Sequence, residues 1–349
     1  MKSKKAKTFK RHKSIGFFDE DIRLSKLSKL GDPLEKLNKG IDFEMFRDLL
    51  KKRLHMEAKN KGGRRPFDYV LMFKILILQR YYNLSDVQTE FQICDRLSFM
   101  RFLGLTIADD VPDSNTVWNF RERLTDLGIV EELFVLFVNK LETLGLIVNE
   151  GKIVDASFVD VPRQRNKKGE NDTIKSGGIP DDWKENPHKL SQKDTDARWT
   201  KKNNETHYGY KNHAKCDAKS KVVTKYVVTD ASVHDSQPLL GLLDGKDEGQ
   251  PLFADSAYVG EDLHEKLGED KKMIIKICEK GYRNRPLTEG QKESNKEQSK
   301  TRARVEHIFG FMENSMNGSF IRCIGFARAE ATIGLMNLTY NLFRKLQIS

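Results

Sequence analysis

The stretch Lys152-Ile-Val-Asp-Ala-Ser-Phe-Val159 decides the fold of this chain, because the sequence pattern changes there. It is short and mostly apolar, with several β-branched residues, which is the pattern of a strand in a sheet. From Asp42 to about Val148, the preceding residues instead repeat apolar side chains at the spacing of helices. We therefore predict an all-α region at residues 41–148, followed by an α/β region at residues 149–349.

In the all-α region we expect about five short helices. The run from Pro66 to Tyr82 is apolar on almost every side, as a central buried helix would be. Two later helices begin after residues that can cap a first turn, namely Ser85 or Asp86 and Asp113 or Ser114.

The α/β region contains further stretches of both kinds. We expect strands at residues 207–214, 221–229, 251–255 and 273–277, and helices at residues 236–243, 261–267, 296–315 and 327–346. This order describes a mixed sheet flanked by helices, which is the layout of an RNase H-like fold and of some other α/β folds. Residues 162–205 are polar and irregular, so we expect a functional or mobile insertion there.

The composition indicates a polyanionic partner. The 349 residues carry 61 Lys+Arg against 51 Asp+Glu, a formal net charge of +10, which favours nucleic acid over an anionic membrane. No stretch approaches the roughly 20 consecutive apolar residues of a bilayer helix, so no membrane contact is expected. The four cysteines form neither a zinc motif nor a disulfide pattern, which favours the cytoplasm. We interpret residues 1–40 as a basic arm, either a DNA clamp or a solubility tail.

Four acidic residues lie at or beside the ends of predicted strands: Asp155, Asp230, Asp235 and Asp255. A carboxylate there costs free energy unless it is paired or binds a cation, although Asp at a strand end also bonds backbone N–H groups. Glu306 lies on a predicted helix next to residues 271–304, which carry eleven Lys/Arg and four Glu. Arg302 precedes Glu306 by one helical turn, so the two form either an ordinary ion pair or part of a site.

Several motifs resemble the DDE transposases of bacterial insertion sequences, close to the insertion sequence five group. The motifs lie between residues 40 and 345 and are Gly63-Arg-Arg-Pro66, Tyr82-Asn-Leu-Ser-Asp86, Pro112-Asp-Ser-Asn-Thr116, Ile153-Val-Asp-Ala-Ser157, His234-Asp-Ser236, Ala254-Asp-Ser-Ala-Tyr258 and Arg302-Ala-Arg-Val-Glu-His307. The resemblance implies an RNase H-like catalytic domain. It matches Asp155, Asp255 and Glu306 to the family's catalytic acids, and Arg302 to the basic residue before the Glu.

By this resemblance, the protein binds the inverted-repeat ends of its own element, cleaves the DNA and transfers the 3′ ends to target DNA. Three carboxylates without Cys or His ligands favour Mg²⁺, with Mn²⁺ as a substitute, and two such ions can activate the attacking oxygen and stabilise the leaving oxygen. We expect Asp155, Asp255 and Glu306 to be both catalytic residues and metal ligands, and Asp230 and Asp235 to be neither. The alternatives are a catalytically inactive DNA-binding relative and a metal-dependent nuclease of the same fold without strand transfer.

Double-stranded DNA is the expected partner. The expected DNA-binding residues are Arg302, Arg304, Lys300, Arg283, Arg285, Arg121 and Arg123. The segment from Leu84 to Leu124, which carries the last two, is either a helix-turn-helix that reads DNA or a packing and dimerisation unit. Ser299 and Glu313 stand where the family usually has Tyr and Lys, which leaves the three acids unchanged but puts the usual DNA contacts of those positions in question. The resemblance also implies a homodimer, acting in the bacterial cytoplasm and on the nucleoid when bound to DNA.

Overall fold

The computed structural model describes residues 16–349, except 56–64, 203, 259–262, 264 and 282–285. The most basic part of the expected arm, Met1–Lys13, therefore lies outside the described residues. The rest of the segment that we interpreted as a basic arm contains two helices, α1 (Asp19–Leu30) and α2 (Pro33–Gly40). The helix α2 has an apolar face, with Leu34 and Leu37 buried, and α2 contacts α6 and α16.

The described residues between 41 and 148 are mainly helical, as their apolar spacing predicted. The elements are η1 (Phe43–Phe46), α3 (Arg47–Leu54), α4 (Tyr69–Tyr81), α5 (Asp86–Asp95), α6 (Leu97–Leu103), α7 (Ser114–Asp126) and α8 (Ile129–Thr143). Ser85 forms a capping box with Gln88 at the start of α5, and Asp113 accepts the N–H of Thr116 at the start of α7. Both predicted caps are therefore confirmed, and α4 is the predicted buried central helix.

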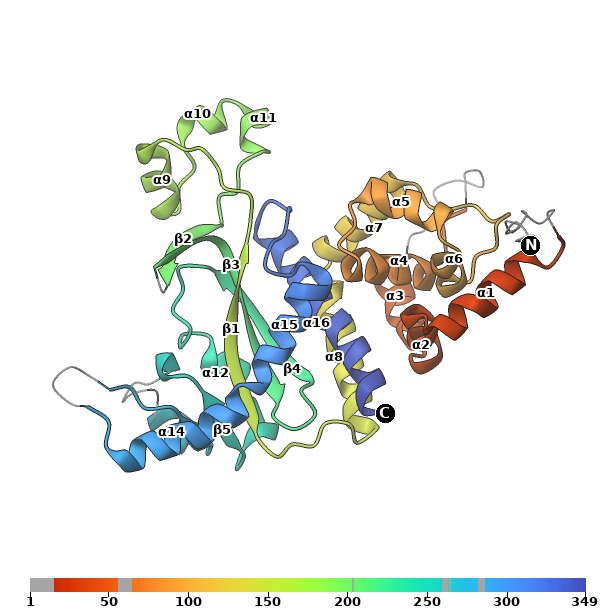
Figure 1. Ribbon diagram of the computed structural model, residues 1–349. Coiled ribbons are helices and arrows are strands. Elements are labelled where there is room, and N and C mark those ends of the chain that lie inside the picture. Colours follow the sequence, from red (N-terminus) through yellow and green to blue (C-terminus); the bar gives the residue numbers. More distant parts are fainter. Residues whose placement is uncertain (1–15, 56–64, 203, 259–262, 264, 282–285) are drawn as a thin grey trace, which may run out of the picture.

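The sheet is mixed and, in the described part of the chain, has six strands (Figure 1). They are β1 (Lys152–Asp160), β2 (Arg198–Lys202), β3 (Glu205–Asp217), β4 (Val223–Asp230), β5 (Pro251–Ala254) and β6 (Ile274–Ile277). β3 pairs antiparallel with β1, β2 and β4, whereas β5 pairs parallel with both β1 and β6. This is the predicted RNase H-like layout, with β2 added. The short, highly charged β2 was missed because it lies inside the polar insertion.

Helices flank the sheet. They are α12 (Leu239–Leu242), η2 (Gly245–Asp247), η3 (Ser256–Tyr258), η4 (Lys266–Asp270), α14 (Glu289–Arg302), α15 (Arg304–Met316) and α16 (Phe326–Ile348). The single helix predicted at residues 296–315 is in fact two, α14 and α15, which meet at Ala303. α14 contacts β5 and β6, whereas α15 contacts β1, so the break redirects the chain across the sheet. Within the described residues, no helix is both long and apolar enough to cross a membrane.

The helical and α/β regions share one hydrophobic core. α16 contacts α2, α4, α7 and α8 as well as β4, and Figure 1 shows α16 and α8 between the sheet and the other N-terminal helices. Asn337 of α16 is fully buried and exchanges hydrogen bonds of 3.1 Å with Asn212 of β3. Gly334 allows α16 to pack closely against β4, because a Cβ at this position would clash with the hydroxyl of Tyr226. The change of sequence pattern near residue 148 is thus not a boundary between separate cores.

The insertion between β1 and β3 contains folded elements of its own. They are α9 (Lys168–Lys175), α10 (Asp181–Lys184) and α11 (Pro187–Leu190), which Figure 1 shows projecting beyond the end of the sheet. Trp183 is fully buried, and its Nε1–H donates to Glu170 at 2.9 Å. Asp194, also buried, accepts the hydroxyl of Tyr210 of β3 at 2.9 Å. The small core around Trp183 and the hydrogen bond between Asp194 and Tyr210 therefore order a segment whose sequence predicts irregular structure.

Candidate active site

Asp155 lies on β1, and Asp255 directly follows the neighbouring strand β5. β1 and β5 run parallel, with Ile153 paired to Phe253. Two residues further on, Asp155 of β1 and Asp255, which directly follows β5, share one register and one face, because side chains alternate along a strand. Neighbouring strands are about 4.8 Å apart, so two carboxylates at this position repel each other.

Asp155 is a largely buried carboxylate with one cationic partner. Its side chain is only 16% exposed. Oδ1 accepts the backbone N–H of Ala156 at 2.8 Å, and Oδ2 accepts a hydrogen bond of 3.1 Å from Nη1 of Arg302. Burial raises the pKa of Asp155 to about 6, the charge of Asp255 acts in the same direction, and Arg302 opposes them. A further cation beside Asp155 would favour its charged form.

Arg302 also connects this carboxylate to Glu306. Nη2 of Arg302 lies 3.6 Å from Oε1 of Glu306, four residues later. Arg302 is the last residue of α14 and Glu306 is in the first turn of α15, so the pair spans the break at Ala303. A negative charge is favoured at that helix start. The third predicted acid is therefore linked to the first through one guanidinium group.

The three acids have the donor chemistry of a site for a hard cation, because carboxylate oxygens without Cys or His suit Mg²⁺ or Mn²⁺. Across the described residues, no group of three or more His, Cys, Asp or Glu side chains is close enough to hold a metal ion. The side chain of Glu306 is 65% exposed and lies near Arg302. The three carboxylates therefore fit a hard cation in their chemistry, but they do not converge closely enough in this structure to share one.

Lys202 is a neighbour of these acids that the sequence did not reveal. It ends β2, and its Nζ donates to Asp235 at 3.0 Å. Although burial works against its charge, the bond to Asp235 and the charges of Asp255 and Asp155 raise the pKa of Lys202. Asp235 also accepts a bond of 2.8 Å from Lys211. Nothing distinguishes Lys202 from other lysines of the insertion in sequence, because its position depends on the pairing of β2 with β3.

The other strand-end residues have local roles. Asp230 accepts the backbone N–H of Ser232 at 2.8 Å, as a turn-forming Asp does. Tyr258 is fully buried, and its hydroxyl has no hydrogen-bond partner in the described part of the chain. Burial and the charges of Asp155, Asp235 and Asp255 raise the pKa of Tyr258 well above its usual value, so it stays a neutral donor near the acids.

Residues 148–342, which contain the three acids, match the family described as Transposase DDE domain. The chain belongs to the transposase DDE domain family. Residues 22–123 match a second family, described as Transposase domain (DUF772). The chain is also similar to a solved structure, the cryo-EM structure of the piggyBac transposase synaptic complex with hairpin DNA. The identity is 13% and the TM-score 0.44, over 92% of this chain and 76% of that chain.

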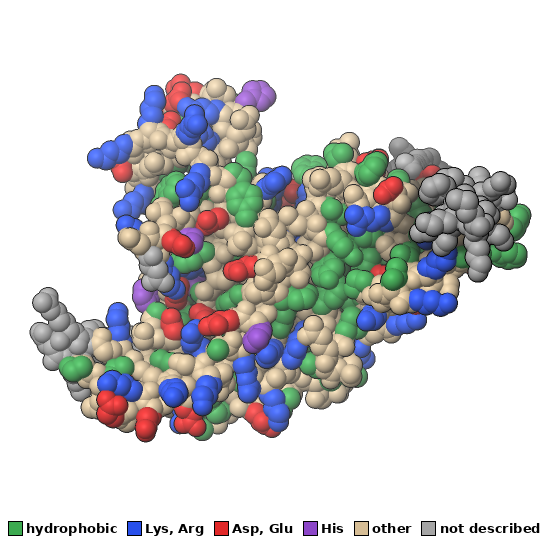
Figure 2. Space-filling view, in the orientation of Figure 1, with side chains coloured by type: hydrophobic (Ala, Val, Ile, Leu, Met, Phe, Trp, Pro, Cys, Tyr) green, Lys and Arg blue, Asp and Glu red, His purple; other side chains and the backbone are tan. Residues whose placement is uncertain are grey.

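Basic residues lie close to the acids of this DDE domain. Lys300 and Arg304, at the junction of α14 and α15, are exposed, and Arg304 also donates to the carbonyl of Ala218 at 2.8 Å. Arg283 and Arg285 lie outside the described residues. Figure 2 shows acidic side chains gathered between the projecting insertion and α14, with Lys and Arg on both.

The two arginines predicted to bind DNA in the helical region are engaged within the protein. Arg121 of α7 forms an ion pair with Asp86 at 2.6 Å, and it also donates to Gln79 at 2.8 Å. Arg123 donates to the backbone carbonyl of Leu54 at 2.9 Å. Both arginines therefore have structural partners within the protein, and a DNA contact of either one stays a prediction.

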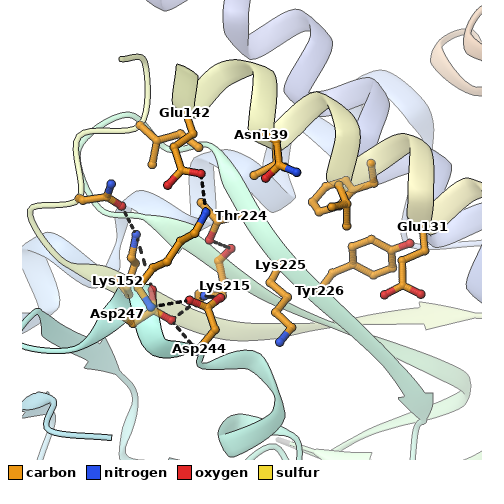
Figure 3. Close-up of a pocket in the computed structure, with 16 residues that line it drawn as sticks. Glu131, Asn139, Glu142, Lys152, Lys215, Thr224, Lys225, Tyr226, Asp244 and Asp247 are labelled. Atoms are coloured by element: carbon orange, nitrogen blue, oxygen red, sulfur yellow. Dashed lines mark hydrogen bonds and ion pairs between the residues drawn. The ribbon is translucent and has the colours of Figure 1, made fainter. Parts of the chain in front are cut away.

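A cavity of about 230 Å³ between α8 and β4 contains a network of ion pairs in its lining, and Asp155, Asp255 and Glu306 do not line it (Figure 3). Lys215 is 2% exposed and donates to Asp244 at 2.9 Å and to Asp247 at 2.6 Å. Lys152 lies 3.7 Å from Asp247 and donates to Asn149 at 2.6 Å. These buried charges neutralise one another and tie β1 and β3 to the segment before β5, so the network has a structural role.

Proposed function

We propose that the chain is a transposase that binds the inverted-repeat ends of its own insertion sequence, cleaves the DNA phosphodiester and transfers the 3′ ends to target DNA. Asp155, Asp255 and Glu306 are its catalytic residues and hold two Mg²⁺ ions, which Mn²⁺ replaces. The matched register of Asp155 and Asp255 carries this proposal. Two carboxylates on adjacent parallel strands repel each other until cations offset their charge.

Membership of the family supports metal-dependent chemistry, because DDE transposases use divalent cations. Such cations, when bound, supply an activated attacking oxygen and stabilise the leaving oxygen of a phosphodiester. The contribution of the chain is positioning. The N–H of Ala156 and the guanidinium of Arg302 orient the carboxylate of Asp155. Lys202, held by Asp235, supplies a positive charge that attracts the phosphate.

DNA is the substrate in this proposal, and exposed basic residues around the acids hold its backbone. Lys300 and Arg304 are placed for this role at the junction of α14 and α15, beside Arg302. The formal net charge of +10 supports a polyanionic substrate. We infer a homodimer as the active form, since one chain carries one set of three acids and transposition joins two ends.

The test measures Mg²⁺-dependent cleavage and strand transfer on DNA that carries the ends of the element. Asp155→Asn, Asp255→Asn and Glu306→Gln should each reduce both activities by more than about a hundredfold. DNA binding should persist or tighten, because a negative charge near the phosphates is removed. Asp230→Asn is the matched control and should keep both activities, since Asp230 bonds only its own turn. Full cleavage by Asp255→Asn would refute the proposed site.

The same assay separates the two alternatives. A catalytically inactive DNA-binding relative would bind the ends of the element but would not cleave them with either Mg²⁺ or Mn²⁺. A nuclease of the same fold would release cut ends and never yield a joined product. The presence of all three acids, Asp155, Asp255 and Glu306, favours an active enzyme over the first alternative.

A further inference from the structure

A groove of about 690 Å³ is separate from the cavity of Figure 3 and has different lining residues. One wall comes from α4, α5 and α7, and the other from residues 317–324 and the first half of α16. Its charged lining residues are four arginines and two acids, namely Arg80, Arg121, Arg322, Arg328, Asp86 and Glu122. Both acids are already paired, because Asp86 binds Arg121 at 2.6 Å and Glu122 binds Arg328 at 2.7 Å. The groove thus has an excess of two positive charges.

Arg80 is the first of the two unpaired cations, and it is buried. It lies in the last turn of α4 and is 9% exposed. Nη2 donates to the carbonyl of Met316 at 2.5 Å and to Asn83 at 3.0 Å, but Nε has no hydrogen-bond partner among the described residues. Burial lowers the pKa of Arg80 to about 10, so the group stays charged at neutral pH. A buried cation without a counter-charge is costly, and an anion in the groove would offset that cost.

Arg322 and Trp118 complete the groove from opposite walls. Arg322 is exposed and forms no ion pair within the residues that the structure describes. Trp118, on α7, is 44% exposed, which is unusual for so large an apolar ring. An exposed aromatic face next to unpaired arginines suits a nucleic acid strand, whose phosphates bind cations and whose sugars and bases pack on rings.

The groove is joined directly to the strand that carries Asp155. The N–H of Asp160, at the end of β1, donates to the carbonyl of Ser319 at 2.8 Å, and the N–H of Ile321 donates back to Asp160 at 2.9 Å. Asp155 and Asp160 are five residues apart on β1, roughly 16 Å at the rise of a strand. That length corresponds to about five base-pair steps, so one DNA duplex can reach both places.

We propose that this groove binds a phosphodiester of the DNA, with Arg80 and Arg322 holding the phosphate and Trp118 packing against the adjacent sugar or base. The identity of the ligand as DNA rests on the proposed function. The phosphate chemistry rests on the two arginines alone. A free nucleotide has the same chemistry, and the experiment separates the two sources.

The experiment measures binding to a mixed-sequence duplex of about 30 base pairs by fluorescence anisotropy at several salt concentrations, without divalent metal. Arg322→Ala should weaken binding several-fold and reduce the slope of log K against log salt by about 0.9, the value for one lost phosphate contact. Lys140→Ala, which removes an exposed basic residue on α8 that does not line the groove, is the control and should have a smaller effect on both. Equal effects of Arg322→Ala and Lys140→Ala would overturn the proposal.

Trp118 provides a second readout that does not depend on a change of charge. Adding the duplex should change the tryptophan fluorescence of the wild type, and Trp118→Phe should lose most of that change. Arg80→Gln should weaken binding at least as much as Arg322→Ala if it folds, which its melting temperature shows. If Arg80→Gln is unfolded, the duplex affinity of Arg322→Ala and the fluorescence response of Trp118→Phe test the proposal instead. An unchanged fluorescence response in Trp118→Phe would contradict the proposed contact.

Titrations with dAMP and with inorganic phosphate identify the source of the phosphate. Weak binding of both, displaced by the duplex, supports a DNA site. Tight binding of dAMP that the duplex does not displace would assign the groove to a free nucleotide and overturn the DNA assignment. Because none of these measurements needs cleavage, a protein that binds DNA through the groove but never cuts it would refute the proposed function and leave this inference standing.

Discussion

Nη1 of Arg302 lies 3.1 Å from Oδ2 of Asp155, although the two residues are 147 positions apart in the chain. This contact fixes the junction of α14 and α15 against β1, and the same guanidinium lies 3.6 Å from Glu306. One arginine therefore sets the distance between the acid on the strand and the acid on the helix. Its positive charge also opposes the burial that raises the pKa of Asp155 to about 6.

Arg302→Ala should lower the free energy of unfolding by about 1–3 kcal/mol, because it leaves Asp155 buried without its charged hydrogen-bond donor. In an Asp155→Asn background the same substitution should cost much less, since no buried charge remains there. Denaturant unfolding of the four proteins gives the coupling energy directly. Equal costs in the two backgrounds would mean that Arg302 acts only through its own helix.

The candidate site was predictable from sequence where the signal was local. Asp155 and Asp255 each interrupt or end an apolar run, and Glu306 follows Arg302 by one helical turn. Each of these patterns is set by neighbours a few residues away. The order of elements predicted a mixed sheet flanked by helices, but not the specific pairing of β1 with β5 that brings Asp155 beside Asp255.

The features that sequence did not predict depend on contacts between distant parts of the chain. Lys202 reaches the acids only because β2 pairs with β3. The local sequence predicts one helix, but the helix breaks at Ala303 because α14 and α15 pack against different strands. Arg121 and Arg123 looked available for DNA, yet their partners Asp86 and Leu54 come from other elements. No single-sequence pattern contains these pairings.

His213 should make the protein sensitive to acid. It is fully buried, its Nε2 lies 2.9 Å from the hydroxyl of Thr229, and its Nδ1 has no partner in the described part of the chain. Burial lowers the pKa of His213 to about 4, below the value of about 6.5 in an unfolded chain. Between these values the unfolded state binds more protons through this group, so the contribution of His213 to stability should fall by up to about 3 kcal/mol as the pH falls from about 6.5 to about 4.

His213→Gln should remove this part of the pH dependence, and urea unfolding across that pH range measures it. His188→Gln is the control, because His188 is exposed on α11 and its replacement should leave the profile unchanged. Because Asp155 contributes with the opposite sign over nearly the same range, the difference between the two profiles is the test, and a His213→Gln profile that runs parallel to the wild-type profile would contradict the prediction.

Trp183→Ala should unfold the insertion without unfolding the protein. The ring is fully buried among α9–α11, so its loss removes most of a small separate core. Limited proteolysis should then cut within residues 164–193, while the main thermal transition shifts by only a few degrees (about 2–4 °C). Trp199→Ala is the control, since Trp199 is 43% exposed, and should resist proteolysis like the wild type. A large loss of overall stability in Trp183→Ala would show that the insertion belongs to the main core.

A divalent cation should reverse the cost of burying Asp155. Its pKa is about 6 in the folded protein and about 3.9 in an unfolded chain, so the folded state binds more protons between these values. The contribution of Asp155 to stability is therefore full below about pH 4 and is lost as the pH rises through about 6, at a cost of up to about 3 kcal/mol. At pH 7 without metal, Asp155→Asn should be at least as stable as the wild type, because no charge has to be buried.

Mg²⁺ at a hundred times its dissociation constant should then stabilise the wild type by about 2.7 kcal/mol and Asp155→Asn far less. Thermal melts with Mg²⁺ and with EDTA measure both differences, and Asp230→Asn should respond like the wild type because it lies in a separate turn. An equal gain from Mg²⁺ in the wild type and in Asp155→Asn would mean that the ion binds elsewhere, and the proposed role of Asp155 as a ligand would fail.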